Sequence, residues 1–245
     1  MKMLICSICE NHFEIEDNVY SDLIKFNATI ICDDCIDKSD EEDKERESKE
    51  AQERFVNKMK NSGYLPRHLD QTFDNFDVPN ARARIVGAVK KYDPASGKWL
   101  FLLGKTGTGK DHIASAIGRE YVLNSYKSIY AGTMQAIMRR YRDMAFGEVR
   151  SETETFKDIA EVGLLIIRDI GVKSLTDAER GVIVDILDHR YNCNLPVIVT
   201  GNVRPEMLKD VFDERVIDRM KEVSYTINDK FTVAFDWDSY REGKV

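Results

Sequence analysis

The chain has 245 residues, enough for one full-sized domain and a smaller part beside it. Apolar residues make up 42% of the composition, no stretch approaches the roughly 18 apolar residues of a membrane span, and the first residues lack an apolar signal-peptide core. These features predict a cytoplasmic protein without a membrane segment. Residues 1–54 hold 16 acidic and 7 basic side chains, which leaves 27 acidic and 29 basic ones in the rest. Bulk charge therefore gives no argument for a nucleic-acid binder, although it is compatible with a local basic groove.

Two Cys-x-x-Cys pairs begin and end the first 35 residues. Cys6 and Cys9 form one pair, Cys32 and Cys35 the other, with 22 residues between the pairs. Four thiolates that converge from two tight turns are the ligand set of a structural zinc site. A segment this short buries little core, so the metal would supply its principal folding energy. We expect a zinc-binding domain over residues 1–35; four unrelated thiols are the alternative.

A highly charged segment follows at residues 36–62. Of the 18 residues from Asp37 to Arg54, 14 are charged, and Pro and Gly are absent from that stretch. Only Phe55, Val56 and Met59 offer an apolar face. The composition predicts a linker, either a solvated helix or a disordered tether, and leaves a recognition helix as the alternative.

Residues 63–245 alternate between strand and helix patterns. Short apolar runs predict buried strands, and the stretches between them have helical periodicity. The predicted strands are Trp99–Leu103, Lys127–Ala131, Gly163–Ile167 and Pro196–Thr200, and the predicted helices include Asp111–Leu123, Thr133–Phe146 and Asp177–Tyr191. Such alternation predicts an α/β domain in which helices cover both faces of a parallel sheet.

A phosphate-binding loop lies between the first predicted strand and the first predicted helix of this domain. The segment GKTGTGK has the spacing G-x-x-x-x-G-K, and a plain strand-to-helix turn is the alternative. Its glycines let backbone N–H groups point at phosphates, and its lysine reaches the β- and γ-phosphates. The residues predicted to bind ATP or ADP are Gly104, Lys105, Thr106, Gly107, Thr108, Gly109, Lys110 and Asp111.

Two positions on the magnesium side of this motif depart from the usual pattern. Asp111 stands where Ser or Thr normally binds Mg²⁺, and the strand LLIIRD places Arg168 where a metal-holding aspartate is usual. Asp169 then takes the place of the water-activating glutamate. An ion pair between Asp111 and Arg168 would make hydrolysis weak, whereas metal binding by Asp169 would leave the activity ordinary. Both alternatives stay open on the sequence.

Four segments in order resemble the DnaC/DnaI-type helicase loaders of bacteria and their phages, which are P-loop ATPases of the AAA+ class. These segments are GKTGTGKDHIASAI, GLLIIRDIGV, ERVIDRM and FDWDSYR, and the resemblance covers roughly residues 63–245. It implies an AAA+ ATPase domain that acts in an oligomer. The residues it implies as catalytic are Lys110, Asp169, the first sensor Asn202, the arginine finger Arg219 (with Arg215 as a second candidate) and the second sensor Arg241.

The resemblance also implies binding of single-stranded DNA, which needs basic and aromatic side chains on one face. The stretch IMRRYRDMAF offers Arg139, Tyr141, Arg142 and Phe146 for this role. An amphipathic surface helix is the alternative.

The function implied is that of a helicase loader in DNA replication, which binds a DnaB-like replicative helicase through the zinc domain and delivers it to single-stranded DNA. Two alternatives stay open: an IstB-like transposase-helper ATPase, and a helicase adaptor that binds nucleotide with little hydrolysis. The expected cofactors are ATP or ADP, Mg²⁺ and Zn²⁺.

Overall fold

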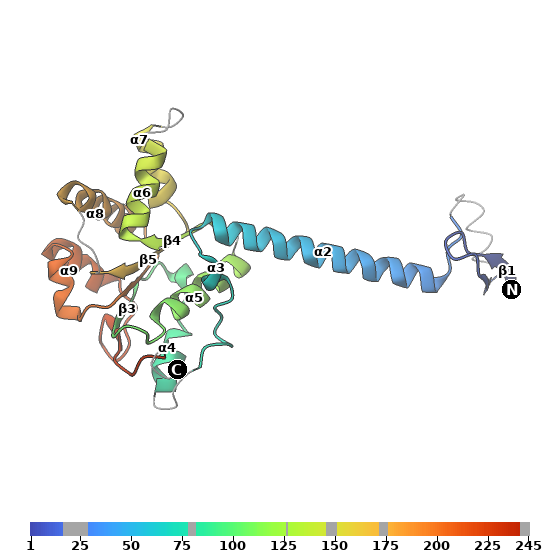
Figure 1. Ribbon diagram of the computed structural model, residues 1–245, viewed down its shortest axis with the longest axis horizontal. Helices are drawn as coiled ribbons and strands as arrows, with labels where there is room; N and C mark the ends of the chain where they lie inside the picture. Colours follow the sequence, from blue (N-terminus) through green and yellow to red (C-terminus); the bar gives the residue numbers. More distant parts are fainter. Residues whose placement is uncertain (17–28, 78–81, 126, 146–150, 172–175, 241–245) are drawn as a thin grey trace. The chain divides into compact units, whose positions relative to one another are not determined.

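The computed structural model describes residues 1–16, 29–77, 82–125, 127–145, 151–171 and 176–240 (Figure 1). The chain divides into two units, Met1–Arg54 and Phe55–Val245.

The first unit contains a small hairpin and most of a long helix. β1 (Lys2–Ile5) pairs antiparallel with β2 (His12–Ile15). Alternation along the strands leaves Leu4, Phe13 and Ile15 half-buried on one face. The helix α2 (Asp33–Asn61) begins at the second cysteine pair, so the charged linker is a helix and not a tether.

The sequence of α2 explains both its length and the place where the second unit begins. Exposed ion pairs one turn apart, such as Arg54 with Glu50, support the charged stretch weakly. Phe55 and Met59 are buried in the core of the second unit. The unit boundary therefore falls inside α2, at the first of the apolar residues that the sequence offers there.

The second unit is built on a five-stranded parallel sheet. Its strands are β3 (Leu100–Gly104), β4 (Ile129–Thr133), β5 (Leu164–Ile170), β6 (Val197–Gly201) and β7 (Thr232–Phe235), in the spatial order β4-β5-β6-β3-β7. The four predicted strands are confirmed, whereas β7, an edge strand of four residues, was not predicted.

Helices cover both faces of this sheet (Figure 1). Leu100, Leu102 and Ile166 face one core with α4 (Ala83–Val89) and α5 (Lys110–Asn124), and α3 (Pro66–Leu69) contacts α5. Phe101 and Ile167, which point the opposite way, face a second core. The second core is completed by α6 (Met134–Ala145), α7 (Glu152–Ala160), α8 (Asp177–Asn192) and α9 (Glu214–Val223). The predicted α/β architecture is confirmed.

Within the described ranges, no helix has both the length and the apolar character that crossing a bilayer requires.

Candidate nucleotide-binding site and metal centre

The phosphate loop connects β3 to α5, as the sequence predicts. Gly107 and Gly109 have φ angles of +77° and +88°, which L side chains rarely adopt. A Cβ at Gly107 would overlap Ser239, and one at Gly109 would overlap the ring of Phe76. Lys110 Nζ donates to the carbonyl oxygens of Gly104 and Lys105, so the ammonium group lies inside the loop. The loop can thus present both backbone N–H groups and a cation to phosphates.

A cavity of about 940 Å³ opens beside this loop, which is the size of a nucleotide pocket. Four predicted site residues from three different strand ends share it, namely Lys110, Asp111, Asp169 and Asn202. Of the other predicted loop residues, Thr106, Gly107 and Gly109 line the cavity, whereas Gly104, Lys105 and Thr108 do not. The remaining lining residues are Arg67, His68, Gln71, Asn75, Phe76, Asp77, His112, Ser239 and Tyr240.

Much of this wall was missed by sequence reasoning because no motif marks it. Residues 67–77 approach the loop from the chain before the sheet, and Ser239 and Tyr240 approach from the chain after it. The backbone N–H of Tyr240 donates to Gly107 O at 3.0 Å. The segment FDWDSYR contained the signal for Ser239 and Tyr240, but the prediction drew only on Arg241, which lies outside the described residues.

The magnesium side of the cavity differs from the expected arrangement. Arg168 is only 5% exposed, and its guanidinium lies 2.7 Å from His68 Nδ1 and donates to Ser115 Oγ at 3.2 Å. It also stacks on the ring of Tyr64, with 4.8 Å from Cζ to the ring centroid. Asp111 Oδ1 instead accepts a 2.5 Å hydrogen bond from Thr200 Oγ1. The suggested ion pair between Asp111 and Arg168 is therefore wrong: the arginine has turned away from the cavity toward α3 and α5.

Asp169 faces the cavity because β5 is irregular at this point. The pairing of β5 with β6 shifts between Ile167 and Ile170, and Asp169 has a φ of +54°. Such a bulge re-aims a side chain at the end of a strand. Burial, followed by the charge of Asp111, raises the pKa of Asp169. Two carboxylates that repel one another thus lie beside the phosphate loop.

The two candidate arginine fingers lie on α9 and share one partner. Arg219 and Arg215 both form ion pairs with Asp188 on α8, the latter at 2.9 Å. Arg219 also lies over the ring of Tyr191, at 5.0 Å from its centroid. In the single chain, both guanidinium groups therefore lie against α8.

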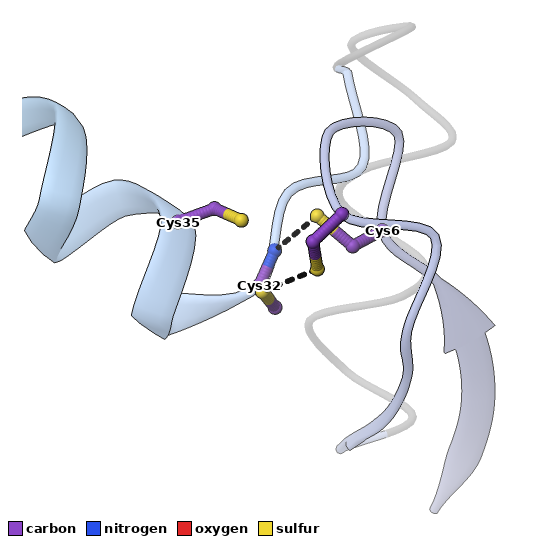
Figure 2. Close-up of side chains that lie close together, drawn as sticks. Cys6, Cys32 and Cys35 are labelled. Atoms are coloured by element: carbon purple, nitrogen blue, oxygen red, sulfur yellow. Dashed lines mark hydrogen bonds between the residues drawn. The ribbon is translucent and has the colours of Figure 1, made fainter.

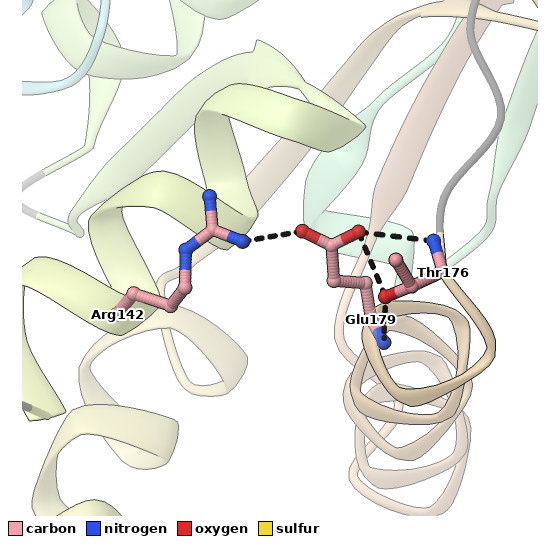
Figure 3. A network of polar contacts seen from close by, with 3 residues as sticks. All are labelled: Arg142, Thr176 and Glu179. Carbon is pink, nitrogen blue, oxygen red and sulfur yellow. Dashed lines mark hydrogen bonds and ion pairs between the residues drawn. The ribbon is translucent and has the colours of Figure 1, made fainter.

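The predicted DNA-binding face on α6 is only partly present. Tyr141 is 9% exposed and packs in the second core, because it follows Ile137 and Met138 by four and three residues. Its placement on an exposed face is therefore wrong. Arg142 forms an ion pair with Glu179, which also accepts from the backbone N–H and hydroxyl of Thr176 (Figure 3). Arg139 is exposed, and Phe146 lies outside the described residues.

The four cysteines of the first unit converge. Their four sulfur atoms all lie within 4.8 Å of one another, and the residues are Cys6, Cys9, Cys32 and Cys35. Figure 2 labels three of these side chains. The sulfurs of Cys9 and Cys32 are 3.6 Å apart, close to the edge of about 3.8 Å that Zn–S bonds of about 2.3 Å give a tetrahedron.

The electrostatics of these thiols also suit a cation. Hydrogen bonds from backbone N–H groups, above all that of Cys32, lower the pKa of Cys6 to about 6. A hydrogen bond with the side chain of Cys9, followed by burial, raises the pKa of Cys35 to about 12. A bound dication would favour the thiolate form of each ligand. The donor set and its spacing therefore fit a zinc ion.

Comparison with known proteins identifies the family of the second unit. The family described as IstB-like ATP binding protein matches residues 39–241. The chain belongs to this family. The replicative helicase loader DnaC of Escherichia coli (strain K12) is 33% identical over 185 residues, which cover 74% of this chain and 73% of DnaC. The match to the family begins after the four cysteines, so these lie outside it.

Solved structures agree on the fold. The crystal structure of the DnaC helicase loader superposes with a TM-score of 0.55 at 23% identity, covering 69% of this chain and 99% of that chain. The structure of DnaI gives a TM-score of 0.53 at 21% identity, with 70% and 94% covered. The predicted AAA+ fold is thereby confirmed.

Proposed function

We propose that the protein is an ATP-dependent helicase loader in DNA replication, which binds a DnaB-like replicative helicase and delivers it to single-stranded DNA. The similarity to DnaC over most of both chains is the observation that carries this proposal. A transposase-helper ATPase is compatible with the family match alone. Similarity to a named helicase loader favours the loading function.

The nucleotide is ATP or ADP, bound with its phosphates in the loop Gly104–Lys110. Lys110 binds phosphate oxygens, and Asn202 orients phosphate or water, because both side chains line the same cavity. Asp169 is the carboxylate placed to position water. Any Mg²⁺ would take its protein ligands from Asp111 and Asp169, since the position of the usual metal-holding aspartate is occupied by an arginine buried on other partners.

Hydrolysis is weak in this proposal. Catalysis of phosphoryl transfer depends on positioning, and here one of the usual metal positions holds a cation. A helicase adaptor that binds nucleotide with little turnover is therefore the second candidate, and the burial of Arg168 favours it. In either case the identity of the bound nucleotide, ATP or ADP, and not rapid turnover, controls binding to the helicase.

The remaining roles follow from the same proposal. The unit with the four thiols binds zinc and engages the helicase. In a homo-oligomer, Arg219 leaves Asp188 and reaches the γ-phosphate of a neighbouring subunit, and Arg241 acts as second sensor. Single-stranded DNA binds near Arg139 and Arg142 on α6, with phosphates and not stacking as the principal contact, because the ring of Tyr141 is buried. The protein acts in the cytoplasm.

A loading assay tests the proposal. The purified chain is mixed with the replicative helicase and circular single-stranded DNA, with and without ATP, and helicase retained on the DNA is measured. We expect retention to rise with the wild-type chain, to be lost in Lys110→Ala, and to persist in Lys91→Ala, which changes an exposed lysine outside the cavity. Failure to bind the helicase under every nucleotide condition, together with capture of a transposase on duplex DNA, would overturn the loading function.

A further inference from the structure

Two guanidinium groups flank the imidazole of His68 at the rim of the nucleotide cavity. Arg168 approaches Nδ1 at 2.7 Å, and Nε of Arg67 lies 3.1 Å from Nε2. The histidine is 3% exposed, and burial, followed by the charge of Arg168, lowers its pKa to about 4. The ring is therefore neutral at pH 7, with one N–H and one lone pair.

Arg67 uses one of its N–H groups to hold on to this ring. Its Nε–H donates a hydrogen bond to Nε2 of His68 at 3.1 Å. The hydrogen bond occupies Nε only, so the terminal N–H groups of the guanidinium are left at the cavity wall that Arg67 lines.

Arg67 forms no ion pair among the residues that the structure describes. Its charge lowers the pKa of Asp169 without a salt bridge between the two. Lys110 and Arg67 are thus the two cations on the cavity wall, and the charge of Arg168 lies directly behind His68. This is the side of the loop where the family pattern has metal ligands and this chain has Arg168.

We infer that Arg67 is a phosphate-binding residue, which its hydrogen bond to His68 holds at the cavity wall, and that its charge makes nucleotide binding independent of a divalent ion. The guanidinium fork suits phosphate oxygens, and it needs no ion to bridge them. The inference rests on the proposed binding of nucleotide at the loop.

Titration of a fluorescent ATP analogue, once with excess Mg²⁺ and once with EDTA in its place, tests this inference. We expect wild-type affinity to change by less than about threefold between the two conditions. Arg67→Ala should weaken binding about tenfold or more in EDTA, the usual effect of losing a charge-assisted hydrogen bond. Arg67→Lys should recover part of the loss because it keeps the charge. Arg84→Ala, an exposed arginine outside the cavity, is the matched control.

The outcomes separate the inference from the function on which it rests. Binding that falls more than about tenfold in EDTA, with Arg67→Ala indistinguishable from Arg84→Ala, overturns the inference and leaves nucleotide binding intact. A wild-type chain that binds no nucleotide in either condition overturns both. Arg67 is exposed, so its variants should keep the wild-type melting temperature.

Discussion

Replacing Gly109 by alanine should damage both folding and nucleotide binding through a single methyl group. Gly109 has a φ of +88° and immediately precedes the first residue of α5, Lys110. A Cβ there would overlap the ring of Phe76, which also packs on His112 at 4.9 Å and on Tyr240 at 5.7 Å between centroids. The methyl group therefore meets the wall of the cavity and not open space.

The Gly109→Ala substitution carries two free-energy costs, which add. A left-handed backbone costs an L residue about 1–2 kcal/mol. Overpacking adds about 1–3 kcal/mol, because the ring of Phe76 is 8% exposed and has rings on two sides. We expect the free energy of unfolding to fall by about 2–5 kcal/mol. Affinity for nucleotide should fall by more than tenfold, about 1.4 kcal/mol, since the loop N–H groups are displaced.

Denaturant unfolding and titration with a fluorescent ATP analogue check the two effects. Gly181→Ala is the control: this glycine lies in α8 with no atom within 4 Å of an added Cβ, so alanine should stabilise the chain by about 0.5–1 kcal/mol. If Gly109→Ala unfolds and binds nucleotide as the wild type does, the described loop geometry is not that of the protein in solution.

Three further outcomes follow from the same structure. Cys32→Ser should abolish stoichiometric zinc, measured by elemental analysis, and helicase binding with it, whereas Cys193→Ser, outside the thiol cluster, should retain both. Arg219→Ala should lower ATP turnover about tenfold or more with little change in nucleotide affinity; an equal loss of affinity would argue against an arginine finger. His68 stays neutral in the fold down to its pKa of about 4, whereas the unfolded chain takes up the proton near 6.5, so the free energy of unfolding should fall as pH drops between these values. The His68→Gln variant should lose that part of the slope.

Sequence reasoning succeeded where a local pattern has one physical solution. Apolar runs between helical stretches gave four of the five strands of the sheet, and the glycine spacing gave the loop between β3 and α5. The paired cysteines were correctly expected to converge. Even the end of α2 was marked by the apolar residues Phe55, Val56 and Met59, of which Phe55 and Met59 are buried in the core.

It failed where the direction of a side chain, and not the identity of the residue, determines what the residue contacts. Arg168 was recognised as a departure, but no motif marks its partners His68 and Ser115, and the bulge that aims Asp169 into the cavity has no sequence signature. Tyr141 was assigned to an exposed face because its arginine neighbours are polar, although its spacing from Ile137 places it in the core. The residues before the sheet that wall the cavity carry no motif, so they could be found only from the fold.

The two departures on the magnesium side form one rearrangement. Asp111 and Ser115 lie one turn apart on α5, the first bound to Thr200 and the second to Arg168. Arg168→Asp alone would add a third carboxylate near Asp111 and Asp169 and leave His68 Nδ1 without its charged donor. Asp111→Ser alone would leave the cation of Arg168 with less opposing charge. The double change should therefore cost less stability than the sum of the single changes, by about 0.5–3 kcal/mol in a double-mutant cycle. If the free-energy changes of the two single variants were strictly additive, the two positions would be energetically independent.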